Sequence, residues 1–272
     1  MRIAVALHMF NYELLEEYVT YLRNITCPYE LFVTVPDDGA LVTAAWPHVH
    51  LYPHQPNRGM DIGGFLTVLP DIFKGDYDLL LKLHSKSLVE WRRQLLDPIC
   101  GSDDAVKRVL QVFSTDKEVG LVGADKWLIT EGEYTRLANQ AHLSVLTKRY
   151  NCRFLPSRFI GGTMFWVRVS VLSRLLADQN LQELHLELNT PTSCDWAWYA
   201  YEYPDLGSNG VVTPVQLHEH WERFGKSEGR YPNGLVARLA RNTIFCDGMI
   251  EHAYERLFGI AVTHQGLKLV GL

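Results

Sequence analysis

The segment "YDLLLKL", residues 77–83, constrains the fold of this chain more than any other stretch. It is apolar at consecutive positions, so a strand formed from it would be buried on both faces, as strands inside a parallel sheet are. Short apolar runs recur along the chain, and apolar residues with helical spacing lie between them. This alternation predicts an α/β fold with a mainly parallel, Rossmann-type sheet flanked by helices. Strands are expected at residues 2–7, 29–35, 48–53, 77–83, 119–124 and 161–169, with a final strand near residue 270.

Helices are expected between these strands, over residues 14–25, 60–73, 88–99 and 103–113, with Ser102 as the cap of the last. The helix over 60–73 should be interrupted by its own glycines and proline. Residues 193–233 differ in composition from the rest of the chain, being rich in aromatic and turn-forming residues. They predict a small helical module with a helix that ends at Phe224. The expected organisation is an α/β domain of residues 1–192 and 234–272, with the module inserted at 193–233.

Composition excludes several classes of protein. The net charge of -5 over 272 residues argues against nucleic acid as a partner. No apolar run has the length of a membrane span, and the first residues predict a strand and not a signal peptide. The five cysteines are scattered, without a CxxC pair, which favours reduced thiols in the cytoplasm over disulfides or a zinc site.

Cations follow the strand of residues 77–83. Strand alternation puts Lys82, His84 and Lys86 on one face, at the carboxyl end where ligands bind in parallel sheets. Lysine supplies a point charge and histidine a directed N–H, so the three would suit a diphosphate. A row of charges kept for solubility is the alternative, and the apolar residues before it disfavour that interpretation.

Two further groups lie at expected strand ends. Asn57, Arg58 and Asp61 form a polar patch flanked by glycines, where Asp61 could accept hydrogen bonds from a sugar or from its own turn and Arg58 could fork onto phosphate. His8 ends the first strand near the same edge. Small residues precede the expected strand "MFWV" and would leave room for a sugar, although a tight turn explains them nearly as well: Gly161, Gly162 and Thr163.

Other candidates favour structural roles. Trp91 and Trp166 are predicted to lie in the core, and the acid pairs at residues 37–38 and 103–104 in a turn and at a helix start. His218 and His220 lack a third ligand and are assigned to structure. Asp247 begins a helix whose buried stripe is Ile250, Ala253, Tyr254 and Leu257, and spacing alone makes it a cap. Glu251 on that helix is expected to face solvent.

Taken in order, the strand ends resemble the motifs of inverting glycosyltransferases of the GT-A fold. More specifically, "RGMDIGGFL", "LKLHSKS", "GGTMFWVR" and "DGMIEHAYERLFG" together resemble the rhamnan-synthesis protein F family, over residues 1–192 and 234–265. The stretch 196–230 is similar to a "YPDL…HW…EGR" module of bacterial polysaccharide enzymes. The family resemblance implies a role in building rhamnose-rich bacterial surface polysaccharides.

The resemblance also implies roles for residues. Asp247 would be the catalytic base, and Asp37 would meet the nucleotide's base or ribose. His252, Glu255 and Arg256, on the helix that Asp247 opens, would contact sugar or phosphate. The strand of residues 77–83 stands where a metal-binding Asp-x-Asp is usual in GT-A enzymes, so Lys82, His84 and Lys86 would replace the metal. We expect no cofactor and no metal site.

The sequence predicts a cytoplasmic glycosyltransferase, with a peripheral location at the inner face of the plasma membrane as a second option. It would transfer a sugar, rhamnose being one candidate, from a nucleotide-sugar donor to a lipid-linked or oligosaccharide acceptor, beside other polysaccharide-assembly proteins. A non-catalytic sugar- or nucleotide-binding subunit of such an assembly is the alternative, and the missing Asp-x-Asp is its best argument. A methyltransferase is disfavoured because no glycine-rich loop follows the first strand.

Overall fold

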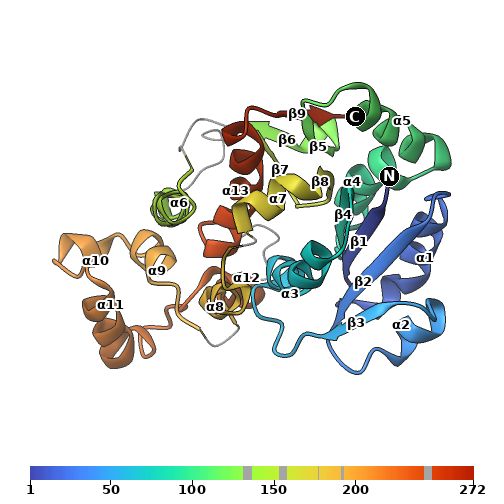
Figure 1. Ribbon diagram of the computed structural model, residues 1–272. Helices are drawn as coiled ribbons and strands as arrows, with labels where there is room; N and C mark the ends of the chain where they lie inside the picture. Colours follow the sequence, from blue (N-terminus) through green and yellow to red (C-terminus); the bar gives the residue numbers. More distant parts are fainter. Residues whose placement is uncertain (131–136, 153–157, 177, 191–192, 242–246) are drawn as a thin grey trace.

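A seven-stranded mixed sheet forms the centre of the protein, in the order β3-β2-β1-β4-β8-β5-β9 (Figure 1). The computed structural model describes residues 1–130, 137–152, 158–176, 178–190, 193–241 and 247–272. The strands of this sheet are β1 (Ile3–His8), β2 (Tyr29–Val35), β3 (His50–Pro53), β4 (Leu79–His84), β5 (Val119–Gly123), β8 (Phe165–Arg168) and β9 (Lys268–Gly271). A separate antiparallel pair consists of β6 (Leu128–Thr130) and β7 (Arg158–Ile160).

Helices connect the strands. Those before residue 190 are η1 (Tyr12–Leu14), α1 (Leu15–Arg23), α2 (Ala40–Ala45), α3 (Met60–Lys74), α4 (Val89–Cys100), α5 (Asp103–Thr115), η2 (Asp125–Trp127), α6 (Leu137–Arg149), α7 (Val169–Leu176) and α8 (Leu181–Glu187). Those after it are α9 (Trp196–Glu202), α10 (Asp205–Ser208), α11 (Pro214–His220), the π-helical turn η3 (Trp221–Gly225), α12 (Gly234–Arg241) and α13 (Ile250–His264).

The first four strands are parallel and confirm the predicted α/β architecture. Every residue of β1 and β4 is buried, as expected of strands inside a parallel sheet. The two strands pair in register from Ile3 opposite Leu79 to His8 opposite His84, so their carboxyl ends lie side by side. Polar residues after these strands are therefore brought to one edge of the sheet.

Strand β8 runs antiparallel to both of its neighbours, β4 and β5. It enters the sheet at the edge where β4 and β5 leave it, because Phe165 pairs with Lys82 on one side and Gly123 on the other. Three segments that are distant in sequence consequently meet there: the one after β4, the one after β5 and the turn before β8. The expected strand 161–169 is correspondingly shorter than predicted, since its first residues form that turn.

Helices α3 and α13 cover one face of the sheet, where Phe258 makes edge contacts with Phe65 and Phe165. The other face carries α4, to which Trp166 donates a hydrogen bond from its indole to the carbonyl of Ile99 (3.1 Å). The predicted interruption of the helix over 60–73 is wrong. Helix α3 continues through Pro70, with eight of its residues buried against the sheet and its neighbours, so packing outweighs the local cost of proline.

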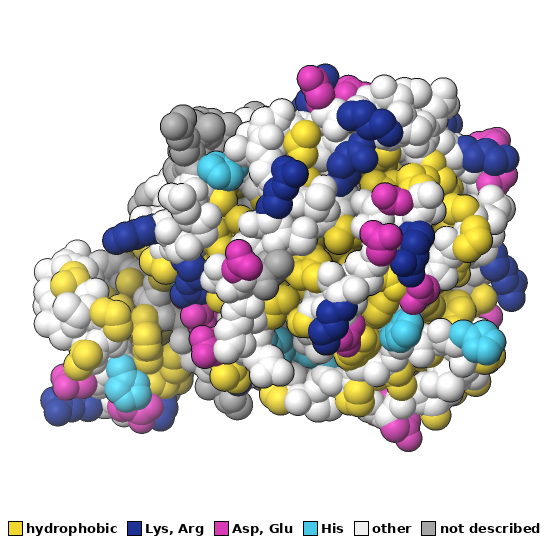
Figure 2. Space-filling view, viewed as in Figure 1, with side chains coloured by type: hydrophobic (Ala, Val, Ile, Leu, Met, Phe, Trp, Pro, Cys, Tyr) yellow, Lys and Arg dark blue, Asp and Glu magenta, His cyan; other side chains and the backbone are white. Residues whose placement is uncertain are grey.

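The segment 193–233 projects from the α/β part as the short helices α9, α10 and α11 (Figure 1). Its inner cluster consists of Tyr199, Leu206 and Leu217. Hydrophobic side chains also gather on its outer surface, seen at the left of Figure 2, and Val212, Val215 and Phe224 are all exposed. In the part of the chain that the structure describes, no helix combines the length and apolar character needed to cross a bilayer.

Candidate functional site

A cleft of about 600 Å³ opens where the carboxyl end of β4, the turn before β8 and the first turns of α13 meet. Its volume is within the range of small-molecule sites. The cleft brings together ten of the predicted site residues, from four regions of the chain: Asp61, His84, Lys86, Gly161, Gly162, Thr163, Asp247, His252, Glu255 and Arg256.

Lys82 and Asp61 form a buried ion pair behind the wall of the cleft. The Lys82 side chain is 1% exposed, and its ammonium donates to the carboxylate of Asp61 at 2.6 Å and to the hydroxyl and carbonyl oxygens of Thr163 at 2.9 and 3.1 Å. Burial alone would raise the pKa of Asp61, but Lys82 and His84 outweigh it and hold that pKa well below its usual range. Lys82 therefore fixes Asp61 in its charged form, and all three ammonium hydrogens are used within the protein.

His84 and Lys86 face the cleft from the end of the same strand. His84 is 8% exposed, and burial lowers its pKa well below the usual value although Asp61 lies 3.6 Å from its Nδ1. Burial lowers the pKa of Lys86 to about 8, against the attraction of Asp61 and Glu255. The Lys86 ammonium rests 3.3 Å from the centre of the Trp91 ring, which places it as a cation on an aromatic face.

The turn before β8 forms one wall of the cleft through its backbone. Gly162 has φ of +93° and Thr163 φ of +51°, a conformation that is uncommon for a β-branched residue. The amide of Gly162 donates to the carboxylate of Glu255 (2.6 Å), and the Thr163 hydroxyl donates to Asp61 (2.5 Å). Backbone strain of this kind persists where the surroundings fix it, as at binding sites.

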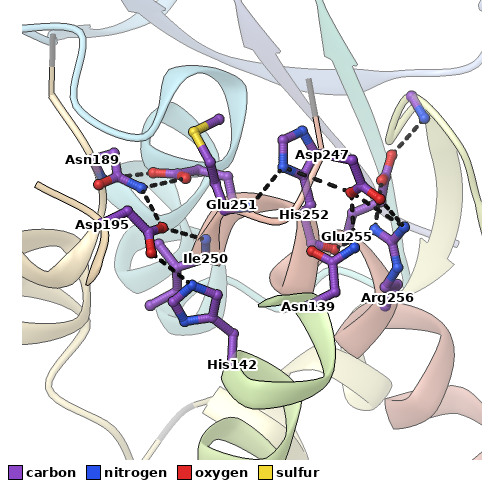
Figure 3. A network of polar contacts seen from close by, with 12 residues as sticks. Asn139, His142, Asn189, Asp195, Asp247, Ile250, Glu251, His252, Glu255 and Arg256 are labelled. Carbon is purple, nitrogen blue, oxygen red and sulfur yellow. Dashed lines mark hydrogen bonds and ion pairs between the residues drawn. The ribbon is translucent and has the colours of Figure 1, made fainter. Parts of the chain in front are cut away.

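Asp247 contributes a carboxylate to the opposite wall (Figure 3). It accepts a hydrogen bond from the Asn139 amide at 2.8 Å and lies 3.4 Å from the Arg256 guanidinium and 3.9 Å from Nδ1 of His252. The interpretation of Asp247 as the helix cap is wrong, because α13 begins only at Ile250 and its N-cap position is Met249. Asp247 therefore precedes the helix and faces the cleft.

His252 and Glu255 have side chains whose charge is controlled by burial. Burial lowers the pKa of His252 to about 4, and its Nδ1 accepts a hydrogen bond from the amide of Met249 (3.3 Å). The neutral ring consequently carries its hydrogen on Nε2. Burial raises the pKa of Glu255 to about 7, although Arg256 and the Gly162 amide oppose it.

A second part of the polar network anchors the start of α13 (Figure 3). Glu251 is 2% exposed, and its two oxygens accept from the backbone and side-chain amides of Asn189 at 2.6 and 3.0 Å. The expectation that Glu251 faces solvent is wrong. The buried Asp195 joins the same cluster by accepting from His142 (3.1 Å) and Asn189 (3.1 Å).

Five predicted residues do not line the cleft. Lys82 lies behind Asp61, and His8 is buried beside Thr34, to whose hydroxyl its Nδ1 is hydrogen-bonded at 2.8 Å. Arg58 donates to the backbone carbonyls of Leu186 and Leu188 at the end of α8. These hydrogen bonds engage the guanidinium of Arg58 within the protein, and its proposed phosphate contact stays a prediction.

Asn57 and Asp37 complete this group of five. Asn57 is half-buried ahead of α3. Asp37 is exposed in the turn after β2, where it accepts hydrogen bonds from the Tyr12 hydroxyl and the Gly39 amide. The roles assigned to these two residues by resemblance also stay predictions.

The cleft residues that were missed or assigned elsewhere include Trp91, Lys126, Trp127 and Arg238. Trp91 was predicted to lie in the core, yet it lines the cleft beside Trp127, with ring centres 5.0 Å apart. Lys126 and Trp127 follow β5, so their position after an expected strand was an available signal. Arg238 lies on α12, far from any strand end, and the sequence carried no such signal for it.

Over the described residues, no cluster of three or more His, Cys, Asp or Glu side chains has a metal-binding arrangement. The predicted independence from metal remains untested.

Comparisons with known proteins agree with the family resemblance. The family model described as rhamnan synthesis protein F matches residues 1–192. Two curated relatives, both named uncharacterized protein WxcX and from two strains of Xanthomonas campestris pv. campestris, are 27% identical over 221 residues, covering 78% of this chain. The chain spans 24% of the length of these relatives. The chain belongs to the rhamnan synthesis protein F family.

Proposed function

We propose that this chain is a GT-A-like glycosyltransferase domain that transfers a sugar from a nucleotide-sugar donor to a bacterial polysaccharide acceptor, with inversion and without a metal. Membership of the rhamnan synthesis protein F family supports the polysaccharide context. The observation that carries the proposal is the cleft itself, which has a carboxylate on one wall, Asp247, and cationic or N–H-bearing groups at the end of a parallel strand on another, His84 and Lys86.

Asp247 would act as the general base. It would accept the proton of an acceptor hydroxyl while that oxygen attacks the anomeric carbon, and the bond from this carbon to the diphosphate would break on the opposite face. The contacts of Asp247 with Asn139 and Arg256 would fix the orientation of its carboxylate. The proton would pass from Asp247 to solvent once the product leaves.

The departing diphosphate would be stabilised by side chains in place of a divalent metal. Lys86 would supply charge, and His84 an N–H group. Lys82 would act indirectly, since its ammonium is engaged by Asp61 and Thr163. Asp61, held in its charged form, would then be available to accept hydrogen bonds from hydroxyl groups of the donor sugar.

The setting of this activity belongs to the proposal as well. The chain spans 24% of the length of its WxcX relatives, so it corresponds to one part of such proteins. We propose that it works on the cytoplasmic side of the membrane, where a lipid-linked acceptor would present its sugar. The alternative role is a subunit of a polysaccharide-assembly complex that binds nucleotide sugars without turnover.

The test measures hydrolysis of a panel of nucleotide sugars by the purified chain, with and without EDTA. We expect turnover that survives the chelator and falls about 10²- to 10⁴-fold in Asp247→Asn, which keeps the shape of the side chain but is a poor base. Asp38→Asn, an exposed change in the turn after β2, is the matched control. Binding without turnover for every nucleotide sugar, unaffected by Asp247→Asn, would favour the binding subunit.

A further inference from the structure

Among the described residues, three cationic side chains line the cleft without a carboxylate partner. Lys86 follows β4, Lys126 lies in η2 and Arg238 lies in α12, so they come from separate elements. Lys82 and Arg256, by contrast, are paired with Asp61 and Asp247 at 2.6 and 3.4 Å. Across the described parts of the chain, Lys86, Lys126 and Arg238 have no ion-pair partner within 4.0 Å.

The charge of Lys86 is affected by burial and by its charged neighbours. Burial lowers its pKa to about 8, Asp61 and Glu255 oppose that shift, and Arg238 and Lys82 make smaller contributions that lower the pKa further. Like charges gathered at a concave surface raise the local concentration of anions and bind them. These three side chains are therefore the cations of the cleft that are available to bind an anion.

An aromatic wall adjoins these cations. The rings of Trp91 and Trp127 lie 5.0 Å apart at 33°, and the Lys86 ammonium lies over the Trp91 ring. Both indole Nε1 atoms are buried, and neither has an acceptor among the described residues. Indole N–H groups that are removed from water are normally hydrogen-bonded, so these two donors are unsatisfied among the described residues.

We propose that Lys86, Lys126 and Arg238 form a diphosphate-binding subsite, and that Trp91 and Trp127 contact the organic group attached to that diphosphate. This inference rests on the proposed function and assigns its anion site to residues from three elements. A diphosphate carries enough charge to engage several cations at once. It could belong to the nucleoside diphosphate of a donor or to the prenyl diphosphate of a lipid-linked acceptor, and the two sources share this chemistry.

Isothermal titration calorimetry with the whole 272-residue chain tests the subsite. The probes are UDP, dTDP, GDP, inorganic pyrophosphate and geranyl diphosphate. We expect at least one to bind, with Kd raised about tenfold in each of Lys86→Ala, Lys126→Ala and Arg238→Ala, because each removes a charge-assisted contact. Lys117→Ala, an exposed lysine that does not line the cleft, is the control and should leave Kd unchanged.

The aromatic wall has its own variant. Trp127→Phe keeps an aromatic ring but removes the indole N–H, and we expect it to weaken binding of a nucleoside diphosphate about threefold while leaving pyrophosphate unaffected. Tighter binding of a nucleoside diphosphate assigns the subsite to the donor, and tighter binding of geranyl diphosphate assigns it to the acceptor.

The outcomes separate this inference from the proposed function. If diphosphate binding depends on the three cations but the chain transfers no sugar, the subsite is supported and the proposed glycosyltransferase activity is contradicted. If nucleotide sugars are turned over but Kd is unchanged in all three alanine variants, the subsite is overturned and the proposed glycosyltransferase activity still stands. The subsite is also overturned when none of the five probes binds.

Discussion

At the scale of single residues, Glu255 makes the stability of the protein depend on pH. Burial raises its pKa to about 7 from an ordinary value of 4.5. Between these two pH values the folded chain keeps a proton that the unfolded chain has lost, so the contribution of Glu255 to stability falls as pH rises through this window. Charging the buried carboxyl group costs up to about 3 kcal/mol.

Glu255→Gln tests this dependence. Glutamine keeps an acceptor for the Gly162 amide but carries no charge. Relative to the wild type, its free energy of unfolding should rise between pH 5 and pH 8, by about 2 kcal/mol, as measured by urea denaturation at each pH. Glu219→Gln, on the exposed surface of α11, serves as the control. Parallel pH profiles for wild type and Glu255→Gln would contradict the assignment.

Lys82 and Glu251 show what local sequence could and could not predict about single residues. Alternation along β4 correctly put Lys82 and His84 on one face, but it carries no information on depth. Lys82 became buried because α3, distant in sequence, brings Asp61 over it. Glu251 was assigned to solvent from its helix alone, and its partner Asn189 lies 62 residues away. Burial of a charged group depends on its partners, which local patterns do not reveal.

At the scale of elements, Asp195 fixes the start of two helices. It is the N-cap of α9, where it accepts from the amide of Trp198 (2.9 Å), and it also accepts from the amide of Ile250, the first residue of α13 (3.3 Å). The helix that carries Glu255 therefore takes its cap from a residue 55 positions away. Asp195 links the 193–233 module to one wall of the cleft.

Asp195→Ala should lower the free energy of unfolding by about 3 kcal/mol, because it removes two caps and the acceptor of His142 and of one side-chain N–H of Asn189. Thr213→Ala removes one exposed cap, that of α11, and should cost about 1 kcal/mol. Urea denaturation of both variants gives the comparison. Equal losses would mean that Asp195 does no more than an ordinary cap.

Elements were predicted better than their contacts. The strands at 2–7, 29–35 and 77–83, and the Ser102 cap of α5, follow from apolar periodicity and capping chemistry that are local. The expected strand 161–169 was too long because its first residues form a turn, one of the two interpretations offered for the glycines, and there the Gly162 amide is bound by Glu255 from a distant helix. The cap of α13 was assigned to Asp247 for the same reason, since nothing local points to Asp195.

At the scale of the whole molecule, the described residues form three apolar clusters. The largest spans the sheet and its helices, and a small one lies entirely within the module around Leu217. Between them is a cluster of Trp198, Leu235, Ala237 and Met249, with Met60 packed against it. Leu235, Met249 and Met60 also line the cleft. The bridging cluster thus connects the module to the cleft, whereas the cluster around Leu217 does not reach it.

Leu217→Ala and Trp198→Ala should therefore distinguish local opening of the module from opening that also reaches the cleft. Leu217→Ala removes buried volume worth about 2–5 kcal/mol within the module, so hydrogen exchange should accelerate at least tenfold in α9–α11 and stay unchanged in α3 and α13. Trp198→Ala should accelerate exchange in the module and also at the start of α13, because Met249 loses its neighbour. Exchange mass spectrometry on both variants measures this directly. Acceleration of α13 in Leu217→Ala would show instead that the module and the α/β part open as one cooperative unit.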